Sequence, residues 1–421
     1  MSTADCTRRT LIGFTGAMTI TGTITGTITG VTGHTWRASI SPSGSVLPWD
    51  ESAPVNWFVA ADDRWHVPAD EATVRQVRLE GTPVTETRVR VPRGDVVQRV
   101  YTVADAGGIT VIEVENESTL PVAIAFDRPG LLTERPPASV PINGIDLPDG
   151  SFVMPLGHAA VLRVGIPHQR AGERAGGPLP KVAPAPAVVR GWLSLTDLAS
   201  RFLLPEGELG TALVDRVRAE RCELALGSIP RAEDDAAGYA IALGELVRMG
   251  EQPDHWIPEL VDAVEQLGAS TGWLADAALT AAGRVLVAAE EHRARRDLQR
   301  IIDQRVPSPR PSSVPDGVGV VPWLEQGFAA SGQILSAGIP TPWFGQSFEV
   351  YNVPTGDASA VSFAVRWHGE RPAVLWEQHG TPVRLTGPVV DPAWSTTVAT
   401  GEALWPAPLV TSAANDGVSF S

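Results

Sequence analysis

The sequence contains few cysteines, with only Cys6 and Cys222 among 421 residues. Neither belongs to a Cys-x-x-Cys pair or a Cys/His cluster, so the sequence predicts no zinc site and no other metal or cofactor. Cys6 lies in a terminal tail and Cys222 in a predicted helix, and we do not expect a disulfide between them. Cys222 is therefore predicted to be a small residue that packs inside the helical region.

The common motifs of catalysis are missing as well. The sequence has no glycine-rich phosphate loop, no Gly-x-Ser-x-Gly elbow and no His-Glu-x-x-His helix. These absences remove the simplest signatures of nucleotide binding, of serine hydrolases and of zinc peptidases.

The sequence has fewer basic than acidic residues, 33 against 48, and its basic residues include a single lysine, Lys181. The formal net charge of −15 repels phosphate backbones and anionic lipids, so we do not expect nucleic acid as a partner. After the first 34 residues no segment approaches the ~20 continuous apolar residues of a membrane span, and no membrane insertion is predicted.

The first 34 residues admit two interpretations. The sequence Thr7-Arg8-Arg9-Thr10-Leu11-Ile12 resembles a twin-arginine export signal, whereas Thr19–Gly30 repeats Thr-Ile-Thr-Gly and no Ala-x-Ala site precedes Trp36. We favour a cytoplasmic protein, with twin-arginine export as the alternative. Whether residues 1–34 are a signal, a tail or a misassigned start is left open.

The rest of the sequence has the composition of a folded protein, with 43% hydrophobic and 19% charged residues. Its length allows two or three domains, each with its own core. A β-rich block, a helical block and a second β-rich block follow one another, and a proline-rich bridge separates each from the next. The sequence therefore predicts six segments: 1–34 low-complexity segment or export signal, 35–170 β-sandwich domain, 171–191 Pro/Ala/Gly linker, 192–305 αα-hairpin domain, 306–320 Pro/Ser linker, and 321–421 small β-domain.

Alternation with a period of two is clearest at Val96–Val103 and Ile109–Glu115, which flank an Asp-Ala-Gly-Gly turn. Thr110, Ile112 and Val114 fall on one face of the second strand, and Val111, Glu113 and Glu115 on the other. Many short strands of this kind predict an antiparallel β-sandwich in the first block.

The central block predicts helices with apolar stripes, separated by glycine and proline. The predicted ranges are Ser194–Leu203, Leu209–Leu226, Glu233–Arg248, Trp256–Leu267, Leu274–Ala289 and Glu290–Arg305. We interpret them as αα-hairpins that form a bundle or partial toroid, in which the alanines of Ala275–Ala282 allow close approach. In the last block, Trp323–Leu335 predicts a short helix, and Val361–Glu377 a hairpin around Gly369–Pro372.

This organisation resembles that of the (α/α)-toroid glycoside hydrolases of the glucoamylase, debranching and glycosyl-phosphorylase type. Asp95–Phe126 is similar to their N-terminal β-supersandwich, and Val361–Glu377 to the β-domain that follows their toroid. The resemblance implies a carbohydrate partner. The helical block, however, is only about half as long as a complete toroid requires.

Glycoside hydrolysis needs two carboxyl groups about 5–9.5 Å apart across the scissile bond. Among the carboxylates in the loops between predicted helices, Glu251, Asp254 and Asp235 are the candidate catalytic residues. Glu251–Trp256 is the strongest candidate loop because it also offers His255 and the sugar-stacking indole of Trp256. The alternative is a solvated loop with an aspartate that caps the next helix.

Two further groups of residues are candidates for binding sugars. Asp62, Asp63, Arg64, Trp65 and His66 combine acids, an imidazole and an indole in one corner, with a salt-bridged turn around a buried Trp65 as the alternative. Trp343 and Trp394 lie among prolines and glycines, so we expect them to be exposed, whereas Trp367 shares a strand face with Val361, Phe363 and Val365 and is expected in the core.

The sequence thus predicts a multidomain β + α protein that resembles carbohydrate-active enzymes. Carbohydrate recognition is the favoured function, and whether the protein is a glycoside hydrolase is left open. The alternatives are a non-enzymatic interaction protein, and a homo-oligomeric glycosidase in which two chains complete one site.

Overall fold

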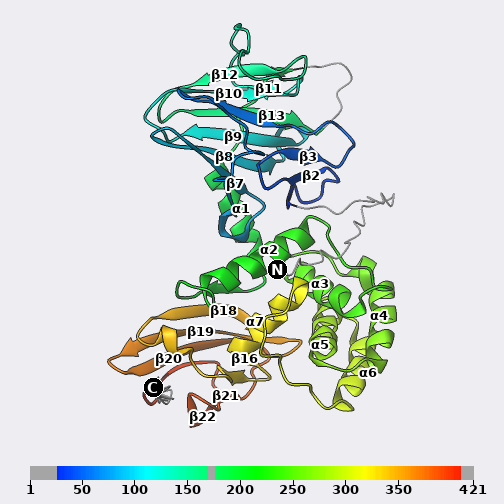
Figure 1. The fold of residues 1–421 in the computed structure, drawn as a ribbon. Helices are drawn as coiled ribbons and strands as arrows, with labels where there is room; N and C mark the ends of the chain where they lie inside the picture. Colours follow the sequence, from blue (N-terminus) through cyan, green and yellow to red (C-terminus); the bar gives the residue numbers. More distant parts are fainter. Residues whose placement is uncertain (1–25, 169–175, 409–421) are drawn as a thin grey trace, which may run out of the picture. The chain divides into compact units, whose positions relative to one another are not determined.

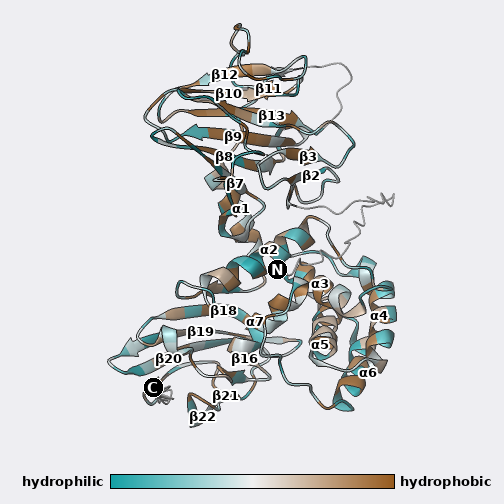
Figure 2. Ribbon diagram, viewed as in Figure 1, coloured by the Kyte–Doolittle hydropathy of each residue, from teal (hydrophilic) through white to brown (hydrophobic). Residues whose placement is uncertain are grey.

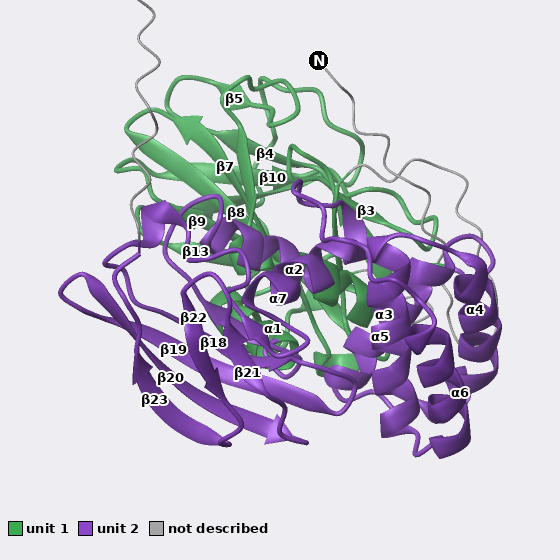
Figure 3. Ribbon diagram, turned by 90° about the horizontal axis from the view of Figure 1, so that it is seen from below, with its two compact units in different colours: residues 1–196, 218–230 green, residues 197–217, 231–421 purple. Residues whose placement is uncertain are grey.

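The computed structural model describes residues 26–168 and 176–408. It divides into two compact units (Figure 3): residues 1–196 and 218–230 form unit 1, and residues 197–217 and 231–421 form unit 2. The described residues contain several β-sheets and seven α-helices (Figure 1), so the predicted multidomain β + α organisation is confirmed.

Unit 1 contains fourteen strands among its described residues, in three sheets. The strands are β1 Thr27–Gly30, β2 Arg37–Ile40, β3 Val46–Pro48, β4 Trp57–Ala60, β5 Trp65–His66, β6 Arg75–Arg78, β7 Thr85–Val91, β8 Gly94–Val103, β9 Ile109–Asn116, β10 Val122–Phe126, β11 Leu132–Thr133, β12 Phe152–Leu156, β13 Val161–Pro167 and β14 Gly177–Pro178. The sheet orders are β1-β2-β3, β12-β10-β4-β5 and β14-β11-β13-β9-β8-β7-β6.

One apolar core joins the four-stranded and seven-stranded sheets of unit 1. Ile112 and Val114 of β9 lie in it with Val59 and Ile124 of the smaller sheet, and the strands around it are strongly hydrophobic (Figure 2). Val111 faces the opposite side, where Glu113 and Glu115 form ion pairs. The predicted alternation at Ile109–Glu115 is therefore confirmed.

Helix α1, Ala185–Thr196, begins inside the segment predicted as a linker. Pro184 and Pro186 suggested an extended chain, but proline is tolerated in the first helical turn, where its missing N–H has no intrahelical partner. Ala185 and Val189 bury the outer face of the seven-stranded sheet at Tyr101 and Val111. Apolar burial thus recruits this segment into unit 1.

The end of the low-complexity segment also belongs to the folded unit. Thr27–Gly30 pairs antiparallel with Arg37–Ile40, and the buried Arg37 side chain donates to the carbonyl oxygens of Val31, His34 and Trp36. The export signal proposed for Thr7–Ile12 and the tail cysteine Cys6 lie outside the described residues.

Unit 2 combines the helical block and the last β-rich block. The other helices are α2 Thr211–Ala225, within which the chain passes from one unit to the other, α3 Ala236–Arg248, α4 Ile257–Ala269, α5 Trp273–Ala288, α6 His292–Asp303 and α7 Val320–Phe328. Its strands are β15 Arg201–Leu203, β16 Ala329–Ala330, β17 Gln333–Ile334, β18 Phe348–Pro354, β19 Ser359–His368, β20 Arg371–Gly380, β21 Leu385–Gly387, β22 Asp391–Thr396 and β23 Thr400–Leu404. Two sheets result, β15-β18-β19-β20-β23 and β16-β17-β21-β22.

Two predicted helix ranges are too long. Arg201–Leu203 was predicted to end a helix but forms β15, which pairs with β18 and buries Phe202. Helix α7 ends at Phe328, before β16 and β17, rather than at Leu335. In both places a strand pairing formed by distant residues replaces the local helical preference.

Close packing of small residues brings α3 and α5 together in unit 2. A Cβ atom added at Gly244 would lie 3.0 Å from Ala281 Cβ, so the helix backbones approach closely there. This agrees with the prediction for Ala275–Ala282. Helices α3 and α5 are mostly hydrophobic, whereas α6 carries many hydrophilic residues (Figure 2).

Among residues 26–168 and 176–408, no helix combines the length and apolar character of a membrane span.

Candidate functional site

A solvent-open pocket of about 240 Å³ lies inside unit 2, where α3 and α5 meet the ends of strands β18, β19 and β20. Its polar lining residues are Arg248, Arg284, Asn352, Asp357, Ser359 and His379. Convergent polar groups in a concavity are typical of a ligand site. A pocket of about 300 Å³ in unit 1 is lined largely by apolar side chains such as Val103, Val188 and Trp192, and offers fewer groups to orient a ligand.

Arg248, at the end of α3, is held firmly in place. Its Nη1 donates to Glu245 Oε1 and to Glu325 Oε1, each at 2.7 Å, and its Nη2 donates to Ala199 O at 2.5 Å and to Asn352 O at 3.2 Å. Burial opposes the charged guanidinium, but the two glutamates outweigh it and raise the pKa of Arg248. Arg248 thus joins the helices to β18 and has its charge compensated.

Arg284, on α5, has a different environment. Its one hydrogen bond among the described residues runs from Nε to Gly356 O at a long 3.5 Å, and it forms no ion pair there. Burial, followed by the positive charge of Arg248, lowers the pKa of Arg284. A guanidinium has five N–H donors, so most of those on Arg284 have no protein acceptor in the described part of the chain.

A β-bulge shapes the opposite wall of the pocket. The register of β18 and β19 shifts between Val350 and Val353, and Asn352 at this position has φ 56°. Asparagine tolerates this left-handed conformation better than most residues. The Asn352 N–H donates to Ser362 Oγ at 3.0 Å, and Ser362 Oγ lies 2.9 Å from His379 Nε2.

The β18–β19 loop is fixed by an ion pair with α6. Arg295 Nε and Nη2 donate to the two carboxylate oxygens of Asp357 at 2.6 and 3.0 Å. A bidentate pair of this kind is geometrically specific. The loop therefore has a firm anchor beside the pocket.

The geometry suits binding better than acid–base chemistry. Among the described residues Asp357 is the one carboxylate that lines the pocket, and it is engaged by Arg295. The side chains of Glu245 and Glu325 are 3% and 4% exposed, and both bond to Arg248. The described lining of the pocket consequently does not offer the two opposed, accessible carboxyl groups of a glycosidase.

The predicted catalytic residues do not converge. Asp235 Oδ1 accepts a hydrogen bond from Gly238 N at 2.8 Å and caps the start of α3. Glu251 and Asp254 are exposed beyond the other end of this helix, which spans 13 residues and hence about 20 Å. Asp235 therefore cannot pair with either of them across a glycosidic bond.

Trp256 is half-buried, and its ring lies 4.0 Å from that of His255. It ends the short 3₁₀ helix Asp254–Trp256 and directly precedes α4. Neither Trp256 nor the predicted catalytic residues line the pocket of unit 2.

The corner at Asp62–His66 forms a self-contained ionic cluster between β4 and the loop after β5. His66 is buried and lies 3.1 Å from Asp63 Oδ1 and 3.0 Å from Glu71 Oε1. Arg64 also binds Glu71, at 2.6 Å, and this bond lowers the pKa of Glu71. Asp62 is exposed, and Trp65, half-buried, donates to Asn143 O. The contacts fit the salt-bridged turn, but Trp65 is half-buried and is not one of the buried core residues.

The expectation that Trp343 is exposed is wrong. Its side chain is 4% exposed and packs between Phe328 and Phe348, with ring centroids 6.2 and 5.3 Å away. Trp394 is half-buried, edge-on to Trp376 and Trp405. Their proline- and glycine-rich neighbourhoods suggested exposed loops, but aromatic packing in the core of unit 2 decides their position.

The sequence reasoning missed the residues that line the pocket. Arg284 offered a signal, because it interrupts the otherwise apolar run Ala281–Ala289. Asn352 and His379 offered none, since each lies in an ordinary strand pattern and reaches the pocket only through the pairing of β18, β19 and β20.

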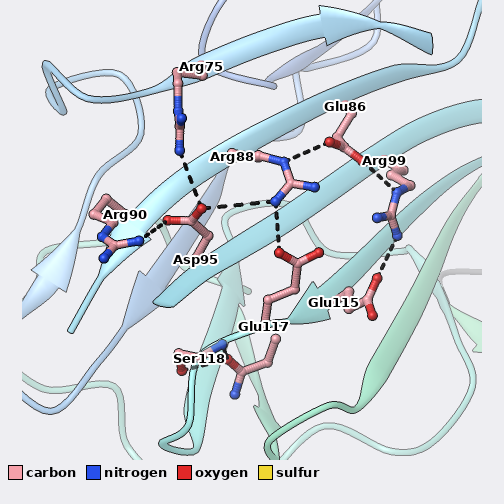
Figure 4. Close-up of polar contacts among 10 residues, drawn as sticks. Arg75, Glu86, Arg88, Arg90, Asp95, Arg99, Glu115, Glu117 and Ser118 are labelled. Atoms are coloured by element: carbon pink, nitrogen blue, oxygen red, sulfur yellow. Dashed lines mark hydrogen bonds and ion pairs between the residues drawn. The ribbon is translucent and has the colours of Figure 1, made fainter. Parts of the chain in front are cut away.

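A second concentration of charge covers the outer face of the seven-stranded sheet in unit 1 (Figure 4). Glu86 binds both Arg88 and Arg99 at 2.8 Å, and Arg99 also binds Glu115 at 2.7 Å. Each of these charges has a cross-strand partner of opposite sign. The charges of this ladder are therefore compensated within the sheet.

Cys222 is buried in a cluster with Trp192 and Leu226, as predicted, and burial raises the pKa of its thiol to about 12. Within the described ranges, no group of three or more His, Cys, Asp or Glu residues could hold a metal ion. No family model matches this chain, and a search of curated proteins also gives no match.

Proposed function

We propose that this protein recognises carbohydrate and that it binds a small sugar in the pocket of unit 2. The pocket carries the proposal because it brings Arg284, Asn352, Ser359 and His379 together beside an anchored aspartate. Sugar hydroxyls act as both donors and acceptors, and a mixed polar lining of this kind can orient them. Its volume of about 240 Å³ suits a single ring rather than a long chain.

The architecture gives secondary support. On this proposal, the two sheets that share a core in unit 1 are a β-sandwich, α3 to α6 are the αα-hairpins of a shortened toroid, and the strands of unit 2 are the following β-domain. That is the organisation in which the sequence resembles the toroidal glycoside hydrolases.

Recognition is favoured over hydrolysis because, in the part of the chain that the structure describes, the pocket has one lining carboxylate, Asp357, and not an opposed pair. A complete glycosidase would need a second carboxylate from another copy of the chain. A protein-interaction role receives less support, since among the described residues of α3 to α6 only two large apolar side chains are exposed, Val261 and Leu274.

A thermal-shift and hydrolysis screen of the full chain against α- and β-glycans and monosaccharides tests the proposal. At least one sugar should raise the melting temperature without being cleaved. The shift should disappear in His379→Ala, in the pocket, and persist in His368→Ala, whose exposed histidine lies on the same sheet. Stabilisation by no sugar would overturn the proposal, and turnover would replace recognition with catalysis.

A further inference from the structure

We infer that the sugar bound in this pocket carries an oxyanion, such as the carboxylate of a uronic acid or the phosphate of a sugar phosphate. This inference rests on the proposed function and names the substrate class of the same site. Its basis is the contrast between the two arginines of the pocket, Arg248 and Arg284.

Arg248 has its acceptors inside the protein, in Glu245, Glu325 and two carbonyl oxygens. Arg284 has a single carbonyl acceptor at 3.5 Å and lies close enough to Arg248 to be affected by its charge. A half-buried guanidinium without a matched acceptor is costly to maintain. The donors of Arg284 border an open pocket, so a ligand can supply the acceptors that the protein does not.

The other acids near the pocket are already engaged. Arg295 holds both oxygens of Asp357, and Arg248 bonds Glu245 and Glu325. These three carboxylates are close enough to favour the charge of Arg284. In the described part of the chain, however, they are oriented toward Arg295 and Arg248, and Arg284 donates a hydrogen bond to none of them. A ligand carboxylate or phosphate can receive two parallel N–H bonds from the planar guanidinium.

The neutral groups of the pocket would then hold the rest of the ligand. Ser359 and His379 line the wall opposite the helices and can exchange hydrogen bonds with ring hydroxyls. This division of roles predicts that a charged sugar binds more tightly than its neutral parent. One charge-assisted bidentate contact corresponds to about ten-fold or more in affinity.

Calorimetric titration of the full chain with D-glucuronate, glucose 6-phosphate and D-glucose tests the inference. The expected result is binding of at least one anionic sugar at least about ten-fold tighter than glucose, with the better anion identifying carboxylate or phosphate. Arg284→Gln should abolish that preference. Arg300→Gln, which changes an exposed arginine on α6, should leave it intact.

The wild-type chain supplies a second readout if Arg284→Gln does not fold. Raising the salt concentration should weaken binding of the anionic sugar and leave glucose binding unchanged. Equal affinity for glucose and both anionic sugars would overturn the inference and leave carbohydrate recognition standing, as would an anion preference that survives in Arg284→Gln. Binding of none of the three, together with a negative glycan screen, would overturn the proposed function itself.

Discussion

At the scale of single residues, two chemically identical side chains of one pocket have different hydrogen-bond partners. Arg248 and Arg284 both line the pocket of unit 2, but only Arg248 is bonded to carboxylates. Burial of a charged group is tolerated when partners compensate it and is costly when they do not. Functional sites often keep a group of the second kind, at some expense in stability.

This contrast predicts opposite effects of the same substitution. Arg248→Met removes the donors shared by Glu245 and Glu325 and should lower the free energy of unfolding by about 3–5 kcal/mol. Arg284→Met removes a guanidinium with one weak hydrogen bond. It should therefore lower the free energy of unfolding by less than about 1 kcal/mol, or raise it. Urea unfolding of both variants measures the difference, and similar losses would show that Arg284 is a structural residue.

His168 of unit 1 predicts a pH dependence of stability. It stacks on Trp36 at 3.8 Å, and burial lowers its pKa to about 4. Between pH 6.5 and 4 the unfolded chain therefore binds a proton that the folded chain does not, so stability falls as the pH falls through this range. The loss amounts to at most about 3 kcal/mol, and less to the extent that solvent reaches the half-buried ring.

Melting curves of the wild type and of His168→Gln at pH 7 and pH 5 measure this effect. The variant should show a smaller fall in melting temperature between the two pH values, whereas His368→Gln, at an exposed histidine, should behave as the wild type does. An unchanged pH dependence in His168→Gln would assign the effect to other groups.

At the scale of secondary-structure elements, helix ends account for residues that the sequence suggested as catalytic. Asp235 accepts a hydrogen bond from Gly238 N, as a capping residue does. A Cβ atom at position 238 would lie 2.1 Å from Asp235 Oδ2, so glycine provides the room for this cap. The cap at the start of α3 thus accounts for the presence of Asp235 and Gly238 without a catalytic role.

Two substitutions at Asp235 separate capping from catalysis. Asp235→Ala should lower the free energy of unfolding by about 1 kcal/mol. Asp235→Asn keeps a capping oxygen and should lower the free energy of unfolding much less. Neither should affect sugar binding. If Asp235→Asn keeps its stability but loses a glycosidase activity present in the wild type, the carboxylate would be catalytic after all.

Elements whose pattern is complete within a few residues could be predicted from the sequence. The strands around the Asp105–Gly108 turn follow from local alternation, and the close packing of α3 on α5 follows from the alanines of α5. Elements decided by distant partners could not be predicted. Arg201–Leu203 forms a strand because β18 pairs with it, and α1 forms where the sheet of unit 1 offers an apolar face.

At the scale of the whole molecule, the sequence indicated the succession of β-rich, helical and β-rich blocks but not how they combine. Helices α3 to α7 and the last strands form one compact unit, and the pocket lies where α3 and α5 meet β18, β19 and β20. Its residues come from positions between 248 and 380, so their convergence depends on tertiary structure and not on any motif. The two loops whose composition suggested a sugar-binding or catalytic site, Asp62–His66 and Glu251–Trp256, do not line this pocket.

Hydrogen–deuterium exchange of the full chain, with and without saturating D-glucuronate or D-glucose, tests most directly whether the pocket binds sugar. Binding there predicts slower amide exchange in residues 352–360 and 378–380 with at least one of the two sugars, and no change in residues 62–66 or 251–256. Unchanged exchange around the pocket with both sugars, or protection confined to either of the two loops, would contradict the assignment of the site.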